Sequence, residues 1–231
     1  INSGKRNPRI RWEKNIGGRV LPPAEGRTYR SYRCQRRRKS TFLNIITGQL
    51  SPDEGKVEWS KRVTVGYLDQ HSSLKKGMTI RDALREAFQH MLDLENEMLG
   101  LYDSMATAED GIEEMMEDAG EIQHILEHSG FYTLDAKIEE IANGLGLGSI
   151  GLEKDVSDLS GGQRTKVLLT KLLLQDPSIL ILDEPTNYLD MEHIEWLKKY
   201  LQNYENSFIV VSHDMEFLNS VINVIYHVND G

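Results

Sequence analysis

Two neighbouring acids, Asp183 and Glu184, stand directly after the four consecutive apolar residues 179–182. An unbroken apolar run of this kind is typical of a strand that is buried on both faces in a parallel sheet. Open α/β sheets bind ligands at the carboxyl ends of such strands. One acid there could hold Mg²⁺, directly or through water, while its neighbour orients and deprotonates a water molecule. The pair predicts metal-assisted phosphate chemistry, and two solvated carboxylates that close a strand are the alternative.

Other segments carry residue types that suit a phosphate ligand. Residues 159–163 (Leu-Ser-Gly-Gly-Gln) precede an apolar-rich helix, so they would set a hydroxyl and close backbone N–H groups against a phosphate. Lys39, Ser40 and Thr41 begin a predicted helix, as the end of a phosphate-binding loop does. In that role Lys39 would reach the β- and γ-phosphates, and the Ser40 hydroxyl would ligate Mg²⁺.

Each of these signals also has a plain structural interpretation when it is taken alone. Residues 159–163 could be a flexible glycine turn, and a Lys-Ser-Thr triplet occurs by chance in many surface helices. Gln70 and His213 each follow a predicted strand and could be capping residues. In the combined pattern, Gln70 and His213 instead become sensors of the γ-phosphate and of the attacking water.

The elements that position these residues alternate along the chain. Apolar runs predict strands at 57–59, 63–68, 179–182, 208–211 and 224–228, and helical patterns fall at 39–48, 164–174, 192–201 and 217–221. Alternating buried strands and helices predict an α/β core with a mostly parallel sheet. Residues 1–38 show neither a helical nor a strand period, so we expect a disordered tail there.

A helical insertion interrupts this core. From about residue 79, apolar residues recur every seven positions up to Met105, and a second helical pattern follows from Ile112 to Leu126. A short break at 110–111 predicts an antiparallel hairpin, with a third helix at 134–143. Between Arg81 and Glu127 there are fourteen acids and two bases. This is either a solvated acidic face or a projecting arm that touches a partner.

Composition limits the class of protein. The 231 residues make one large or two modest domains, with no apolar stretch long enough for a membrane span and no secretory signal. The single cysteine, Cys34, fits a reducing compartment, and we expect a cytoplasmic protein. The first 40 residues carry thirteen Lys/Arg and two acids, a charge of +11, whereas the remainder carries −20. A basic nucleic-acid arm on an acidic domain is one interpretation of that division.

In their order along the chain, the motifs resemble the nucleotide-binding domain of ATP-binding-cassette (ABC) proteins. Residues 159–166 and 183–190 resemble more narrowly those of the ABC-F subfamily, whose ATPases are expected to act at the ribosome. The resemblance covers about residues 39–231. It implies a P-loop NTPase core at 39–78 and 150–231, and a helical subdomain at 79–149 that carries the arm.

The resemblance also assigns roles and partners. It implies ATP and Mg²⁺ as cofactors, and no membrane partner. Glu184 would be the general base and His213 the switch histidine. Ser40, Gln70 and Asp183 would be metal ligands, and the nucleotide would contact Lys39, Ser40, Thr41, Gln70, Ser160, Gly161, Gly162, Gln163 and Asp190. Because the signature of one such domain completes the site of another, a second nucleotide-binding domain is the expected partner, and this half alone should hydrolyse ATP weakly or not at all.

One departure from the family pattern concerns the phosphate loop. Residues 33–38 read Arg-Cys-Gln-Arg-Arg-Arg where the loop should hold glycines, which let backbone N–H groups turn toward phosphates. We interpret residues 1–38 as a frame-shifted reading. One base forward, residues 33–38 can encode Gly-Ala-Asn-Gly-Ala-Gly, which leads straight into Lys39.

Two alternative functions stay open. The ATPase subunit of a membrane transporter shares all of these motifs, but it would lack a long heptad hairpin after Gln70. If the arginines are real, the chain is instead a binding module that does not recognise nucleotides and carries a basic arm.

Overall fold

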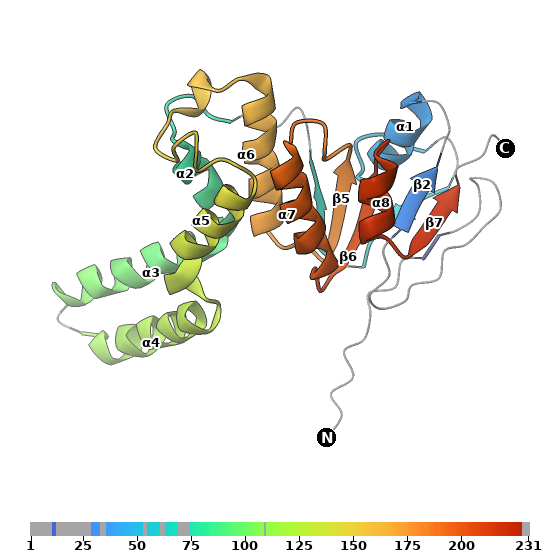
Figure 1. Cartoon of the computed structure of the whole chain (residues 1–231). Coiled ribbons are helices and arrows are strands. Elements are labelled where there is room, and N and C mark those ends of the chain that lie inside the picture. The colour runs from blue at the N-terminus through green and yellow to red at the C-terminus, as the bar shows by residue number, and fades with distance from the viewer. Residues whose placement is uncertain are drawn as a thin grey trace. The chain divides into compact units, whose positions relative to one another are not determined.

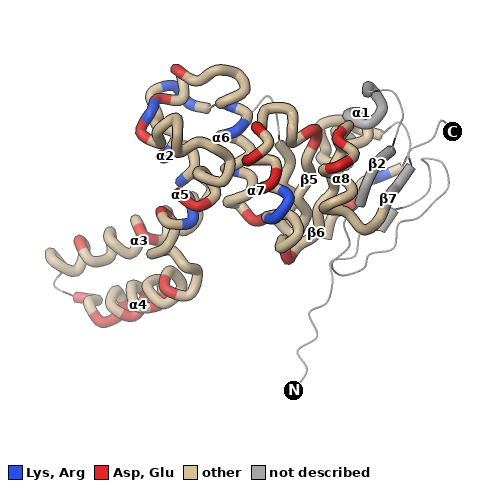
Figure 2. The backbone as a smooth tube through the Cα atoms, viewed as in Figure 1, with Lys and Arg blue, Asp and Glu red and all other residues tan. Residues whose placement is uncertain are grey.

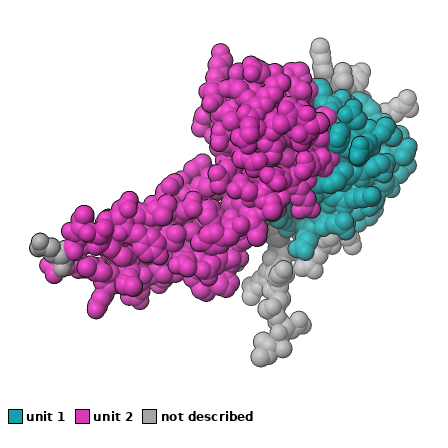
Figure 3. Space-filling view, turned by 60° about the vertical axis from the view of Figure 1, so that its left-hand side comes forward, with its two compact units in different colours: residues 1–72, 176–231 teal, residues 73–175 magenta. Residues whose placement is uncertain are grey.

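The computed structural model describes residues 11–12, 29–32, 36–52, 55–60, 63–68, 74–108 and 110–227, and for 11–12, 29–32, 36–40 and 225–227 it describes the backbone alone. The chain divides into two compact units, one made of residues 1–72 and 176–231 and the other of residues 73–175 (Figure 3). Each unit is described by itself.

The first unit is built on a five-stranded sheet with the order β4-β5-β6-β2-β7. Every pairing in this sheet is parallel, so the carboxyl ends of all its strands lie along one edge (Figure 1). Its strands are β2 (Tyr29–Tyr32), β4 (Val65–Tyr67), β5 (Ile179–Asp183), β6 (Ser207–Val211) and β7 (Val224–His227). A second, antiparallel pair joins β1 (Arg11–Trp12) to β3 (Val57–Glu58).

Helix α1 (Arg36–Ile46) packs on this sheet through Leu43 and Ile46, which are buried against Ile179, Ile181 and Val211. The indole N–H of Trp59 donates a hydrogen bond of 2.9 Å to the carbonyl of Ile46, one of the carbonyls that a helix end leaves without a partner. Apolar burial and this C-terminal contact together fix α1 over the central strands.

Two further helices, α7 (Met191–Gln202) and α8 (Met215–Val221), complete the first unit (Figure 1). The buried ammonium of Lys198 joins them, since it lies 2.6 Å from Glu195 on α7 and 3.2 Å from Glu216 on α8. These two carboxylates raise the pKa of Lys198 and keep it charged.

The second unit is helical. It contains α2 (Ile80–Arg85), α3 (Gln89–Met105), α4 (Ile112–His128), α5 (Leu134–Gly144) and α6 (Gly161–Leu174), with 3-10 turns η1 (Glu86–Phe88), η2 (Phe131–Thr133) and η3 (Val156–Asp158). Helices α2, α5 and α6 pack together, while α3 and α4 form a hairpin (Figure 1). None of the helices in the described part of the chain combines the length and apolar composition needed to cross a bilayer.

The structure differs from the sequence prediction within the first forty residues. Residues 11–12 and 29–32, expected in a disordered tail, form strands, because backbone pairing with β3, β6 and β7 needs no hydrophobic period. Helix α1 begins at Arg36 rather than at residue 39. Residues 150–175 belong to the unit of residues 73–175, in which α6 packs on α2 and α5.

Candidate active site

The best-defined polar contact at the carboxyl edge of the sheet joins the ends of β5 and β6. These strands are adjacent, and Asp183 pairs with Val211 in their register. The backbone N–H of Glu184 donates to the carbonyl of Val211 at 2.7 Å, and Glu184 has a φ of +51°. This left-handed turn is uncommon for a residue other than glycine. It ends the strand at once and directs the chain across the end of β6.

His213 holds the carboxylate of Glu184 at both oxygens. Its backbone N–H donates to Oε2 at 3.1 Å, and its ring Nε2 lies 3.1 Å from Oε1. The Glu184 side chain is 15 % exposed and that of His213 is 63 % exposed. A carboxylate that is fixed in this way and keeps some exposure to solvent could act as a general base for a water molecule.

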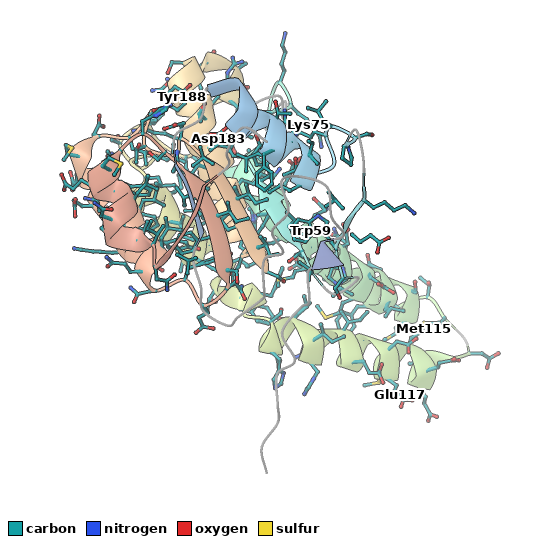
Figure 4. The ribbon with its side chains drawn as sticks, turned by 90° about the vertical axis from the view of Figure 1, so that its right-hand side faces the viewer. Trp59, Lys75, Met115, Glu117, Asp183 and Tyr188 are labelled. Atoms are coloured by element: carbon teal, nitrogen blue, oxygen red, sulfur yellow. The ribbon has the colours of Figure 1, made fainter. Side chains whose placement is uncertain are left out.

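Asp183 and helix α1 reach the same edge. Asp183 is the half-buried last residue of β5 (Figure 4), and α1 is the element that follows β2 in the described part of the chain. The backbones of Lys39 and Ser40 lie near the start of this helix, and Thr41 is exposed. A helix start is a favourable place for an anion, and the carboxylate oxygens of Asp183 are donors that Mg²⁺ prefers.

Asp190 follows the acidic pair by one loop and is the N-cap residue of α7. Its Oδ2 lies 3.4 Å from Nδ1 of His193, and its side chain is 80 % exposed. Tyr188, 46 % exposed, belongs to the same loop (Figure 4). This loop carries polar and aromatic groups that are accessible to a ligand or a second domain.

Residues 159–163 lie in the other unit, where they begin α6. Ser160 and Gln163 form a capping box: the Ser160 hydroxyl accepts from the Gln163 backbone at 3.3 Å, and the Gln163 side chain accepts from the Ser160 backbone at 2.9 Å. Ser160 and Gly161 are exposed, Gly162 is half-buried, and a Cβ atom built on Gly161 would meet nothing within 4 Å. The fold of this unit therefore gives no steric reason for a glycine at position 161.

The structure brings part of the predicted set together. Glu184 and His213 touch, and Asp183 and the start of α1 share their sheet edge. Gln70 lies outside the described residues, as do the side chains of Lys39 and Ser40, and Ser160, Gly161, Gly162 and Gln163 belong to the second unit.

Sequence reasoning missed two groups that build the site. The carbonyl of Val211 anchors Glu184, and no residue type signals a backbone acceptor. Asp214 caps α8 by accepting from the Phe217 backbone at 2.9 Å, which fixes the chain directly after His213. An aspartate three residues before the apolar face of a helix is a recognisable N-cap signal, so this second role could have been found.

Comparison with known proteins identifies the family of the chain. Residues 39–187 match the family model described as "ABC transporter". An uncharacterized ABC transporter ATP-binding protein, YfmM of Bacillus subtilis (strain 168), is 64% identical over 193 residues, which are 83% of this chain and 37% of that protein. The energy-dependent translational throttle protein EttA of Mycobacterium tuberculosis (strain CDC 1551 / Oshkosh) is 37% identical over 196 residues, which are 84% of this chain and 34% of EttA.

Solved structures show the same fold. One, the structure of an ATP binding subunit of an ABC transporter, has a TM-score of 0.62 at 15% identity and covers 90% of this chain and 77% of that one. Another, a model of ribosome-bound archaeal Pelota and ABCE1, has a TM-score of 0.63 at 23% identity and covers 100% of this chain and 34% of that one. A likeness at this level of identity shows the fold alone.

These findings define a class of protein: an α/β P-loop ATPase domain of the ATP-binding-cassette type. The chain belongs to the ABC transporter family. Its relatives named as translational throttle proteins are consistent with the ABC-F subfamily that the motifs indicate. The chain spans about a third of the length of the curated relatives it matches.

Proposed function

We propose that this chain is the first nucleotide-binding domain of an ABC-F protein that binds ATP between two domains, hydrolyses it and acts on the ribosome. The contact between Glu184 and His213 at the carboxyl edge of the sheet carries the hydrolytic part of the proposal. The EttA relatives, whose printed name refers to translation, support the ribosomal part.

In this proposal the candidate site residues of the first unit act on a phosphate at the start of α1. The N-terminus of α1 and Lys39 attract the phosphates, while Asp183 and Ser40 hold Mg²⁺. Bound there, Mg²⁺ would neutralise charge that develops on the phosphate oxygens. Glu184 takes a proton from the attacking water, and His213 keeps the carboxylate in place and can donate to the phosphate. Residues 160–163 would serve a nucleotide held by the second domain.

The test of the hydrolytic role is the Glu184→Gln variant in the protein expressed from its native gene. The amide keeps the size of the carboxylate but cannot accept the proton, so we expect ATP turnover to fall by about 10²-fold or more, while ATP binding persists. Glu192→Gln is the matched control, because Glu192 is exposed in the first turn of α7. Unchanged turnover in Glu184→Gln would refute the role of Glu184.

The transporter alternative is favoured by no specific observation here, although the fold alone fits it equally well. Fractionation separates the two functions. With ATP and the Glu184→Gln variant, we expect the protein to sediment with ribosomes. Recovery in a membrane complex and not with ribosomes would instead establish the transporter function.

A further inference from the structure

Two histidines lie one turn apart on the exposed side of α4. His124 and His128 are separated by four positions, so they share a face of the helix, and both are exposed. Their ring centroids are 4.0 Å apart, and the ring planes are inclined by 31°. Zn–N bonds of about 2.0–2.1 Å require two ligating ring nitrogens to lie within about 4 Å of each other. The two imidazoles are thus close enough to ligate one metal ion.

A hydrogen bond orients one of the two rings. Nδ1 of His128 lies 2.8 Å from the carbonyl oxygen of His124. A carbonyl only accepts, so Nδ1 donates the hydrogen, and Nε2 of the neutral ring keeps the lone pair that a metal ion needs. Histidines that ligate metals commonly donate their other N–H to a carbonyl or carboxylate, which fixes the tautomer and the ring. The structure therefore leaves Nε2 as the ligating nitrogen of His128.

The charge around this pair favours a cation. Residues 89–128 contain twelve Asp/Glu, and there is no Lys or Arg between Glu86 and Lys137. Figure 2 shows red segments and no blue along α3 and α4. The pair also lies at the end of α4, whose last residue is His128, and the C-terminus of a helix attracts positive charge. A field of this sign raises the local concentration of cations.

We propose that His124 and His128 together bind one divalent transition-metal ion such as Zn²⁺, with water completing its coordination. Imidazole nitrogen suits Zn²⁺, Cu²⁺ and Ni²⁺, whereas Mg²⁺ and Ca²⁺ prefer oxygen ligands. The pair belongs to the helical unit, whereas Glu184 and His213 belong to the first unit. This proposal therefore does not depend on the proposed function.

The sequence around the pair also matches a catalytic pattern. Residues 124–128 read His-Ile-Leu-Glu-His, the H-x-x-E-H order of a class of zinc peptidases. Such an enzyme needs a third protein ligand and a glutamate that acts as a general base on metal-bound water. In the described part of the chain no group of three or more potential ligands is assembled, and the Glu127 carboxylate accepts a hydrogen bond of 2.9 Å from the Gln123 side chain. The geometry supports metal binding and not peptide hydrolysis.

A metal ion on this pair would stabilise the base of the hairpin. The two ligands span the final turn of α4, and Ser129 and Gly130 then lead into η2. The two rings are held one above the other only while this turn is helical, so binding favours the folded turn by linkage. Opening of the end of α4 should therefore become rarer when Zn²⁺ is present.

The first test is calorimetric titration of Zn²⁺ into the protein expressed from its native gene. Other groups of the protein can also bind Zn²⁺, so the informative quantity is the difference between matched variants. His124→Gln should weaken binding at this site about tenfold or more, because a single remaining ligand cannot chelate the ion. His90→Gln, at an exposed histidine on α3, is the matched control and should leave the binding unchanged.

A second variant keeps the composition and changes only the spacing. Gln123→His with His124→Gln places the two imidazoles five positions apart, which is about 140° around an α-helix. Both substituted positions are exposed, so far-UV circular dichroism should show no loss of fold. This swapped variant should lose the site as His124→Gln does.

Hydrogen exchange then locates the effect. With Zn²⁺, the amides at the end of α4 should exchange about threefold or more slowly in the unsubstituted protein, and should not change in the swapped variant. Mg²⁺ at the same concentration should give no such protection, because the carboxylates alone do not make the site. Unchanged affinity in His124→Gln, equal Zn²⁺ binding by the swapped variant, or equal protection by Mg²⁺ would overturn the proposal.

Discussion

At the scale of single residues, the site depends on a backbone conformation as much as on a side chain. Glu184 adopts the left-handed region, which costs a residue with a Cβ roughly 1 kcal/mol relative to glycine. This unfavourable conformation occurs at the position where the Glu184 carboxylate is held between the ends of β5 and β6. Strained backbone of this kind is often found at functional sites, which agrees with the role proposed for Glu184.

This conformation predicts an unusual order of stability. Glu184→Gly and Glu184→Ala both remove the carboxylate, but glycine also relieves the left-handed φ. We expect Glu184→Gly to be the more stable of the two by about 1 kcal/mol, although neither should hydrolyse ATP. Urea denaturation followed by tryptophan fluorescence measures the difference, since Trp59 and Trp196 lie in the same unit as Glu184. An alanine variant as stable as the glycine variant would show that the conformation is not strained.

The residues of the candidate site could largely be predicted from the sequence, but the contacts between these residues could not. Asp183 and Glu184 follow the apolar run 179–182, and His213 comes two positions after the apolar run 208–211, a pattern that is visible in the sequence. Their convergence depends on β5 lying beside β6 with Asp183 opposite Val211. This register is set by tertiary pairing between segments that are far apart in the sequence, and no local pattern records it.

At the scale of elements, periodicity predicted the helical hairpin and the strands of the core well, because burial imposes it directly. The seam of α3 and α4 repeats at heptad-like spacing, and β5 is an unbroken apolar run. The short strands β1 and β2 carry no such pattern, and their pairing is visible only in three dimensions. The 3-10 turn η1, which joins α2 to α3, was likewise not predicted, because its residues fit a continuous helix equally well.

The ion pair between Glu86 on η1 and Lys171 on α6 should make the stability of the helical unit depend on pH in the acid range. Glu86 accepts from Lys171 at 2.7 Å and from Lys75 at 2.9 Å, and the bond from Lys171, above all, lowers the pKa of Glu86 below its ordinary value of 4.5. A carboxylate with a lowered pKa in the folded state stabilises it above the unfolded pKa, and this contribution is lost as pH falls through the folded pKa. We therefore expect the stabilisation by the Glu86 carboxylate to be lost as the pH falls below about 4.5.

The Glu86→Gln variant tests this expectation. At neutral pH it should lower the free energy of unfolding by about 1 kcal/mol, and the difference from the unsubstituted protein should shrink as pH falls to about 3. Far-UV circular dichroism during urea denaturation follows the helical unit. Glu140→Gln, at an exposed position on α5, is the control. A difference that stays constant with pH would contradict the assignment of this ion pair.

At the scale of the whole molecule, the N-terminal segment differs from the rest of the chain in its charge and in its match to the family. The first 40 residues carry +11 and the rest −20, and the match to the ABC transporter family begins at residue 39, directly after the arginines. Helix α1 begins at Arg36, and its first turn contains no acid. Arginine at positions 36–38 brings positive charge to the start of a helix, where a phosphate loop needs glycines. We therefore keep the proposal that residues 1–38 are a frame-shifted reading.

The backbone of the first unit fits this proposal. Strand β2 lies between β6 and β7, and α1 is the next described element of the chain, as a helix follows a strand around a phosphate-binding loop. The shifted reading places glycines at positions 33, 36 and 38. The strand and the helix would thus keep their places while the loop gained the residues that its chemistry requires.

Restoring those glycines gives the decisive comparison. The chain with Gly-Ala-Asn-Gly-Ala-Gly at 33–38 should bind ATP with Mg²⁺ at least about tenfold more tightly than the chain as printed, because backbone N–H groups can then turn toward the phosphates. Lys39→Ala in the restored chain is the control and should abolish the gain, since Lys39 would contact the β- and γ-phosphates. Peptide masses from the protein expressed by its native gene test the reading itself. Peptides that match residues 26–38 as printed, or equal ATP affinity in both chains, would contradict the proposal.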